Sequence, residues 1–305
     1  MIAILNYSIV ILDSNDGKKL GEINEDTRIT SFDFTSDGSR ILLTTENKQV
    51  KLYDVNSLEC IRTGLINDIS NSIILSQDET VFFILCRSRC ISSYDFNTFE
   101  HLNKFECGNC NTFCINNDAT IIIIGYNNGI INIIDATTGD NIITLNNRKN
   151  YHSHSISNLS FSADGTKFIA KIGTSEVKIW NSTTFECIKS FDRKFGAIYL
   201  TGFIDENKII LDTNMYSGIY DFVKDDFEFT FESINESRSF MQLNQTCDKI
   251  LFLYSNPNST WESITDIIKV YDLVEKRIIF EIDDFHFFDP GSIKFQPETY
   301  YTGLK

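Results

Sequence analysis

One pattern recurs at intervals of about 40 residues along the whole 305-residue chain. In each copy an alternating apolar run ends in an aromatic or aliphatic residue that is followed by Asp or Asn. The seven copies are Leu12-Asp13, Tyr53-Asp54, Tyr94-Asp95, Ile134-Asp135, Trp180-Asn181, Tyr220-Asp221 and Tyr271-Asp272. Successive copies are separated by 41, 41, 40, 46, 40 and 51 residues. A regular period of this size indicates a repeat architecture, so it constrains the fold before any local motif does.

Each repeat predicts four short strands. Residues 29–45 (ITSFDFTSDGSRILLTT) and 156–172 (ISNLSFSADGTKFIAKI) both run from alternating apolar positions through Asp-Gly into a second apolar run. Asp-Gly between such runs favours a hairpin, because both residues tolerate positive φ. A second turn, carrying Asn47, Asn128 or Asn214, is predicted to place the Asn in left-handed backbone. No apolar period of 3.6 residues is sustained, so we expect an all-β fold.

The four-strand unit resembles the WD40 repeat over essentially the whole chain. The resemblance rests on the third strands that end in Tyr53-Asp54 and Trp180-Asn181, and on the Phe-Ser-x-Asp-Gly type of hairpin upstream. The Gly-His dipeptide of the family is absent, and His154 is its one counterpart. The Asp that the family carries in the second turn is replaced at four positions by Asn47, Asn128, Thr174 and Asn214. The resemblance implies a seven-bladed β-propeller of four-stranded antiparallel blades.

The two ends of the chain each supply part of one blade. Residues 1–23 supply its later strands, and residues 292–305 supply an opening strand and a turn. We therefore predict that both ends share one blade, which closes the ring and removes exposed sheet edges. Residues 1–305 would then form a single domain. Ile2–Leu5 and Tyr300–Leu304 are both candidates for the second strand of this blade, and we favour Ile2–Leu5.

The formal net charge of −15 argues against a general nucleic-acid binder and against adhesion to an anionic membrane surface. The sequence has no apolar run of 18 residues and no basic start followed by a cleavage pattern. Neither a membrane span nor a signal peptide is therefore predicted. We expect an intracellular protein that is cytoplasmic, with the nucleus left open.

Several basic residues fall in loops that would share one face of a propeller. They are Arg87, Arg89, Arg148, Lys149, Arg193 and Lys194. Acidic residues expected on the same face occur elsewhere along the chain, at Glu262, Asp266, Asp283, Asp284 and Asp289. The basic residues are either scattered surface charge or a basic arc for an acidic or phosphorylated peptide.

Two long loops account for the uneven repeat steps. Residues 255–266 (SNPNSTWESITD) carry Trp261, and residues 146–155 (NNRKNYHSHS) carry Tyr151 and His152. Long loops on a rigid scaffold often hold binding residues, and an exposed Trp is a typical hot spot. The alternative for Trp261 is that it folds back onto its own blade.

The eight cysteines allow two interpretations. Cys86, Cys90, Cys107 and Cys110 fall in neighbouring loops of the predicted fold and could bind zinc through four thiolates. Otherwise the cysteines are reduced thiols in the protein interior, an interpretation favoured by the equivalent repeat positions of Cys60 and Cys187.

No motif for catalysis or cofactor binding occurs: HExxH, GxSxG, P-loop and GxGxxG are all absent from the sequence. We predict a non-catalytic interaction scaffold without a cofactor, a monomeric propeller within a larger complex that binds a protein or peptide. The loop-rich face would bind it through Trp261, Tyr151, His152 and the basic arc. The alternatives are a phosphoinositide-binding propeller, although the paired-Arg motif of such relatives is absent, and a metal-dependent propeller hydrolase.

Overall fold

The computed structural model describes residues 2–5, 8–147, 155–214, 217–230, 238–243, 249–255, 266–285 and 293–295. The chain falls into two compact units. The first unit comprises Met1–Ser88, Ser92–Leu102 and Glu236–Lys305, and the second comprises Arg89–Ile91 and Asn103–Asn235. All regular secondary structure within the described ranges is β-strand.

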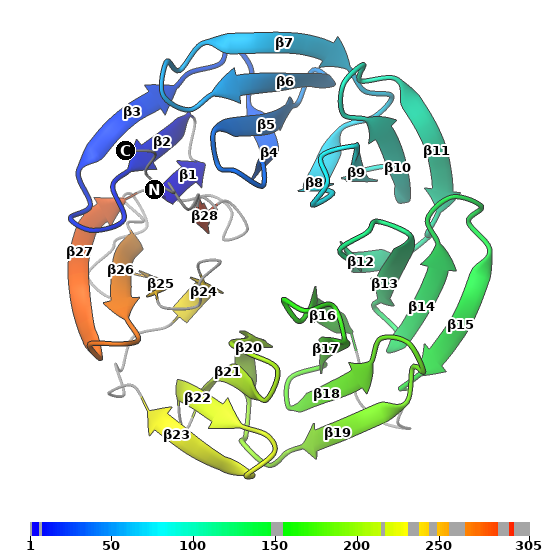
Figure 1. Cartoon of the computed structure of the whole chain (residues 1–305), viewed down its shortest axis with the longest axis vertical. Helices are drawn as coiled ribbons and strands as arrows, with labels where there is room; N and C mark the ends of the chain where they lie inside the picture. Colours follow the sequence, from blue (N-terminus) through cyan, green and yellow to red (C-terminus); the bar gives the residue numbers. More distant parts are fainter. Residues whose placement is uncertain are drawn as a thin grey trace, which may run out of the picture. The chain divides into compact units, whose positions relative to one another are not determined.

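The first unit holds three complete four-stranded sheets (Figure 1). One sheet has the order β28 (Ile293–Phe295), β1 (Ile2–Leu5), β2 (Ile9–Leu12), β3 (Lys19–Ile23). The next is β4 (Ile29–Phe34), β5 (Arg40–Thr45), β6 (Gln49–Asp54), β7 (Cys60–Leu65). The third is β24 (Arg238–Leu243), β25 (Lys249–Ser255), β26 (Asp266–Asp272), β27 (Arg277–Phe285).

The second unit also holds three complete sheets. One sheet has the order β12 (Cys110–Ile115), β13 (Ile121–Tyr126), β14 (Ile130–Asp135), β15 (Asn141–Asn146). The next is β16 (Ile156–Phe161), β17 (Lys167–Ile172), β18 (Glu176–Asn181), β19 (Cys187–Asp192). The third is β20 (Ile198–Phe203), β21 (Lys208–Thr213), β22 (Ser217–Asp221), β23 (Asp226–Thr230). A further sheet, with residues from both units, is β8 (Ser70–Leu75), β9 (Val81–Cys86), β10 (Cys90–Asp95), β11 (His101–Glu106).

The structure confirms the all-β class and the four-stranded sheets with antiparallel pairing. Within the described residues, six sheets consist of four consecutive strands, and one combines β28 with β1, β2 and β3. Ile2 pairs with Phe295 on one side and with Leu12 on the other. The favoured segment Ile2–Leu5 is therefore the second strand of that sheet, whereas Tyr300–Leu304 lies outside the described residues.

Burial differs between the second and fourth strands of a sheet. In β5 the side chains of Ile41, Leu42 and Leu43 are fully buried, while β7 is buried at none of its six positions. Strands that are covered on both faces need a continuous apolar run, and strands open to solvent do not. Neighbouring sheets then pack face to face, as where Ile9 and Ile11 of β2 join Phe32 of β4 in one core cluster.

The repeated Asp or Asn closes the turn between the third and fourth strands. Asp95 Oδ1 accepts hydrogen bonds from the backbone N–H groups of Asn97 (2.8 Å) and Thr98 (2.7 Å). The same pair of bonds occurs at Asp54, Asp135, Asn181, Asp221 and Asp272, and Asp13 makes the first of them. A short polar side chain is needed there because it must reach backbone two residues ahead.

Replacing Asp95 with alanine should lower the melting temperature by a few degrees, because two turn N–H groups lose their acceptor. Asp95→Asn should match the native chain at pH 7, because Asn181 holds the same turn in another sheet. The hydrogen bond from Thr98 lowers the pKa of Asp95. The carboxylate therefore stabilises the fold above its ordinary unfolded pKa, and this contribution is lost as the pH falls through the lower folded-state pKa.

Thermal unfolding followed by circular dichroism between neutral and acid pH tests this prediction. Asp95→Asn should become more stable than the native chain in acid, because an amide does not protonate in this range. Equal losses in acid for the native chain and Asp95→Asn would contradict the role of the charge.

The predicted left-handed position in the second turn is wrong by one residue. Lys48 (φ 64°) and Gly129 (φ 81°) take this conformation, and not Asn47 or Asn128. The Asn47 side chain instead accepts a hydrogen bond from the hydroxyl of Thr45. The side chain thus closes the turn, and the following residue takes the unusual backbone.

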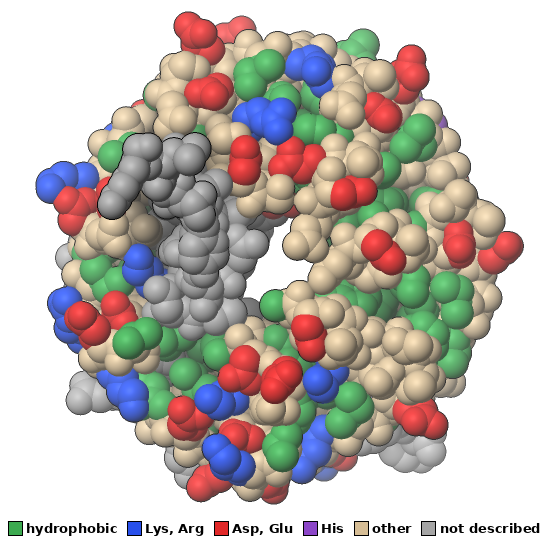
Figure 2. Space-filling model, in the orientation of Figure 1, with side chains coloured by type: hydrophobic (Ala, Val, Ile, Leu, Met, Phe, Trp, Pro, Cys, Tyr) green, Lys and Arg blue, Asp and Glu red, His purple; other side chains and the backbone are tan. Residues whose placement is uncertain are grey.

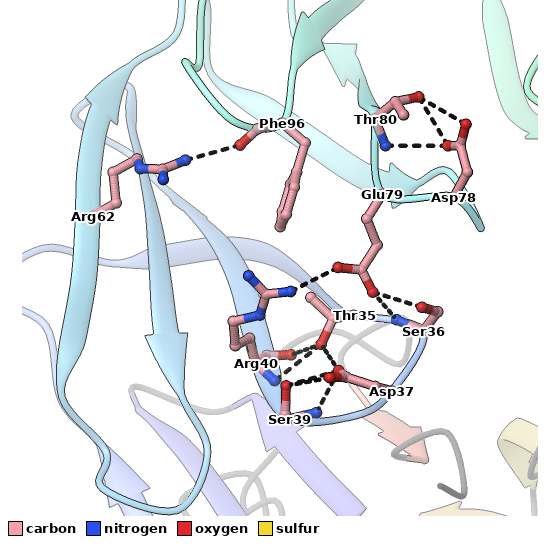
Figure 3. Close-up of polar contacts among 10 residues, drawn as sticks. All are labelled: Thr35, Ser36, Asp37, Ser39, Arg40, Arg62, Asp78, Glu79, Thr80 and Phe96. Carbon is pink, nitrogen blue, oxygen red and sulfur yellow. Dashed lines mark hydrogen bonds and ion pairs between the residues drawn. The ribbon is translucent and has the colours of Figure 1, made fainter.

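A polar contact joins the β4–β5 and β8–β9 turns, both of which belong to the first unit (Figure 3). The Glu79 carboxylate accepts from the N–H (2.9 Å) and hydroxyl (2.6 Å) of Ser36 and from Arg40 Nη2 (2.8 Å). Glu79 has φ 55° at the turn position that Gly38 and Gly165 hold in other sheets. A side chain is strained there, so these contacts explain why this turn has Glu where other repeats have Gly.

Candidate functional site

The basic residues predicted as an arc have different surroundings. Arg87 and Arg89 lie in the turn between β9 and β10, where Arg87 Nη1 is 3.4 Å from Glu46 Oε1 and Arg89 donates to Asn109 Oδ1 (2.5 Å). Arg193 is exposed and has φ 56°. At the lower edge of the face that Figure 2 presents, acidic and basic side chains lie next to one another.

Lys194 belongs to the second unit, where its exposed side chain takes part in a local polar cluster. Its Nζ lies 2.6 Å from Tyr220 Oη and 2.7 Å from Asp225 Oδ2, and it stands over the rings of Phe195 and Tyr220. Desolvation lowers the pKa of Lys194, but the bonds to Asp225 and Tyr220 outweigh it and leave the pKa raised. The bond from Lys194 is also the main reason why the pKa of Asp225 is lowered. Lys194 therefore holds the turn after β22, while its side chain remains 38% exposed.

The remaining predicted binding residues cannot be placed. Trp261, Tyr151, His152, Arg148 and Lys149 lie outside the described residues, as does His154. The described part of the predicted set is therefore Arg87 in the first unit, and Arg89, Arg193 and Lys194 in the second.

A recurring polar contact involves the tyrosine of the third strand. Its hydroxyl forms a hydrogen bond with a residue in the loop that precedes the first strand of the same sheet. Tyr53 donates to Glu25 (2.7 Å), Tyr94 accepts from the N–H of Asn67 (3.0 Å), and Tyr220 bonds with Lys194. A buried hydroxyl needs such a partner. Different loop residues therefore satisfy the tyrosines in a chain that lacks the Gly-His dipeptide.

The four cysteines of the zinc alternative have two different settings in the structure. Cys107 and Cys110 are joined as a disulfide, with Cα atoms 5.6 Å apart. Cys86 and Cys90 are buried, and Cys86 Sγ lies 3.6 Å from Ser92 Oγ. Among the described residues, no group of three or more His, Cys, Asp or Glu side chains is arranged to hold a metal ion.

Two further cysteines are not in the interior, contrary to the prediction. Cys60 and Cys187 are exposed, because each is the first residue of a fourth strand, β7 or β19. Their equivalent repeat positions were correctly recognised, but these positions face solvent. Burial of Cys114 agrees with the prediction, and it raises the pKa of that thiol.

A groove that the sequence did not predict lies in the second unit. It encloses about 640 Å³ and is formed by the turns β16–β17, β20–β21 and β22–β23. Its lining residues are Ala163, Asp164, Ile204, Asp205, Glu206, Asn207, Lys208, Asp221, Val223 and Lys224. One sequence signal was present: Val223 stands at a turn position where five other repeats have Asn or Thr, although Val274 shares this departure in another sheet.

The part of the chain that the structure describes contains no helix with the length and apolarity that a membrane crossing requires.

Comparison with known proteins gives two informative similarities. The chain is 25% identical over 189 residues to the APC/C activator protein CDH1 of Saccharomyces cerevisiae, which covers 59% of the chain and 32% of CDH1. The chain thus spans about a third of that relative's length. Its fold is similar to that of a chain in the crystal structure of the mitotic checkpoint complex, with a TM-score of 0.67, 15% identity and coverage of 82% of this chain and 80% of the other. No family model matches the chain.

Proposed function

Since the chain belongs to the WD40-repeat β-propeller family, we propose that it is a non-catalytic scaffold that binds a protein or peptide partner. The similarity to CDH1 carries this proposal, because that relative is an activator of APC/C. The structural neighbour is likewise a chain of a multi-protein complex. Fold alone does not identify a partner, so the proposal names a class of function only.

The chemistry of the described residues supports a scaffold. The repeated Asp and Asn side chains bond to their own turns, as at Asp54 and Asp272. Lys194 and Asp225 bond to each other. Side chains that hold turns rigidly make a stable platform for loops, and loops on such platforms often carry binding residues.

We infer that the seven sheets form a closed seven-bladed ring and that residues 1–305 are one domain. The shared sheet of β28 and β1 supports this arrangement, because a blade that contains both ends of the chain would close such a ring. The protein would act as a monomeric propeller within a larger complex, in the cytoplasm or the nucleus.

The proposed partner surface comprises two kinds of loop. One kind joins the fourth strand of a sheet to the first strand of the next sheet, and the other joins the second and third strands within a sheet. Its candidate residues are Trp261, Tyr151, His152, Arg87, Arg89, Arg148, Lys149, Arg193 and Lys194. An acidic or phosphorylated segment would suit the arginines, which bind such anions through two parallel hydrogen bonds. Trp261 would supply an apolar hot spot.

Affinity capture from native lysate tests this function. The tagged native chain should capture a defined protein, and Trp261→Ala and the double variant Arg148→Glu/Arg193→Glu should each capture at least ~10-fold less, as expected for hot-spot and charge-pair losses. Lys18→Glu is the matched control, because Lys18 is 80% exposed in a turn at the opposite end of its sheet. Circular dichroism should show that all variants are folded.

Equal capture by every variant would contradict the proposed surface while leaving the scaffold function in place. Capture of no protein by the native chain would contradict the scaffold function itself. Binding of the native chain to vesicles containing phosphoinositides would then favour the lipid-binding alternative.

A further inference from the structure

The groove of the second unit is built from three turns that are each fixed by side-chain hydrogen bonds. Asp164 accepts from Ser162 Oγ (2.6 Å) and from the N–H of Thr166 (3.0 Å). Asp205 accepts from the N–H groups of Asn207 (2.7 Å) and Lys208 (2.8 Å). Asp221 holds the third turn in the same way. The walls of the groove are therefore ordered before any ligand arrives, which lowers the entropic cost of binding.

The charge of the groove is negative. Four carboxylates line it, from Asp164, Asp205, Glu206 and Asp221, against the two lysines Lys208 and Lys224. Both lysines are already occupied. Lys208 Nζ lies 2.9 Å from Glu228 and 3.6 Å from Asp205, and Lys224 Nζ lies 3.0 Å from Asp221.

Two of the four carboxylates form no salt bridge in the described part of the chain, although Lys167 lies near Asp164. Asp164 bonds only to neutral groups of its own turn. Glu206 is exposed and accepts from Asn207 Nδ2 (3.3 Å). Charged side chains in a concave surface concentrate their field there. A ligand with Lys or Arg side chains would therefore be attracted to Asp164 and Glu206.

The groove also presents aliphatic surface. Val223 is 67% exposed, and Ile204 beside it in the lining is partly exposed. At the turn position of Val223, five other repeats carry a polar residue: Asn15, Asn56, Asn97, Thr137 and Thr183. The turn uses only the backbone N–H of Val223, which lies 3.0 Å from Asp221 Oδ1. The valine side chain thus has no role in the turn itself.

We propose that this groove binds a peptide segment of a partner protein in which an aliphatic side chain is flanked by Lys or Arg. The aliphatic side chain packs on Val223 and Ile204, and the basic side chains pair with Glu206 and Asp164. This site lies at the opposite ends of the strands from the loops proposed above, and it favours a ligand of the opposite charge. It therefore stands independently of the first surface.

Fluorescence polarisation with the full chain tests the proposal. The probe is a fluorescein-labelled nonapeptide in which two leucines are flanked by lysines and arginines. One comparison peptide replaces the basic residues with glutamate, and another replaces the leucines with serine. The probe should bind at least ~10-fold more tightly than either comparison peptide, and less tightly at high salt, because both charge and apolar contact contribute.

Two variants locate the binding. Val223→Asn restores the side chain of other repeats and should weaken binding ~5-fold or more, and Glu206→Lys should weaken it at least as much. The matched control is Val274→Asn, because Val274 is 76% exposed at the same turn position of another sheet. A second control, Glu186→Lys, reverses an exposed charge outside the groove. Both controls should bind like the native chain.

Methyl NMR of the valine-labelled native chain gives a reading that does not depend on any variant folding. The Val223 resonance should shift on addition of the probe, and the Val274 resonance should not. Equal binding of the glutamate peptide, or an unmoved Val223 resonance, would overturn the proposal. Sedimentation that shows self-association lost in Val223→Asn would also overturn it, because the occupant would then be a second copy of the chain.

Discussion

Gly218→Ala is expected to lower the free energy of unfolding by about 3 kcal/mol, the upper range for forcing extra atoms into a packed site. Gly218 lies in β22 and pairs with Thr230 of β23. A Cβ atom at this position would lie 2.1 Å from the carbonyl oxygen of Phe229 and 2.9 Å from the Cα of Thr230. Both are backbone atoms, so no side-chain rotation can relieve the overlap. Strand β23 would have to move, and the pairing that Lys194 and Asp225 support would be disturbed.

Gly202→Ala is the matched control for this prediction. Gly202 is also a strand glycine of the second unit, in β20, but a Cβ atom there would meet nothing within 4 Å. Thermal and urea unfolding of both variants should show a large loss for Gly218→Ala and almost none for Gly202→Ala. Similar stability of the two variants would mean that β22 and β23 are not paired as described.

The repeat pattern predicted the strands because it depends on local interactions. Tyr53-Asp54 ends β6 and Tyr94-Asp95 ends β10, as the sequence required. The Asp54 side chain, for example, bonds to backbone N–H groups only two and three residues ahead. A short-range requirement of this kind repeats with the sequence, so it can be read without knowing which sheets are neighbours.

Contacts between distant segments were not predictable in the same way. Lys194 was recognised as a charged loop residue, but its partners Tyr220 and Asp225 lie 26 and 31 residues further along the chain. The positions of Cys60 and Cys187 were correctly seen as equivalent, yet equivalence does not say whether a position faces the interior or solvent. These features depend on how one strand packs on another, which no local pattern specifies.

The groove shows a similar limit. Its charges come from three turns whose sequences look like ordinary turn chemistry, such as Asp164 before Gly165 and Asp205 before Asn207. Among the groove residues, only Val223 departs from the Asn or Thr of five other repeats, and Val274 does so outside the groove. A single exposed aliphatic residue carries little information by itself, and its meaning becomes visible only when the three turns are brought together.

Trp180→Ala should be the most damaging change among the repeated aromatic positions, with an expected loss of about 4 kcal/mol. Trp180 is 3% exposed and stacks on Phe168 with ring centroids 5.0 Å apart. It belongs to a core cluster that also contains Ile133 of β14 and Leu159 of β16, so its side chain contributes to packing between two sheets. Alanine would leave a cavity that paired strands on both sides cannot easily collapse to fill. At roughly 2 °C per kcal/mol for a chain of this size, the melting temperature should fall by about 8 °C.

Trp180→Tyr is the control that keeps an aromatic ring at this position, so it separates loss of the ring from replacement of the indole. Tyr94 occupies the same repeat position in another sheet and stacks on Phe82 at 5.2 Å, so the local fold accepts a tyrosine ring. We therefore expect Trp180→Tyr to cost less than half as much as Trp180→Ala when unfolding is followed by circular dichroism. If both variants lost stability equally, the size of the ring would not matter, and a specific contact of the indole would have to account for the residue. If neither lost stability, the aromatic position would not be part of the core, and the repeated dipeptide would owe its regular spacing to the Asp or Asn alone.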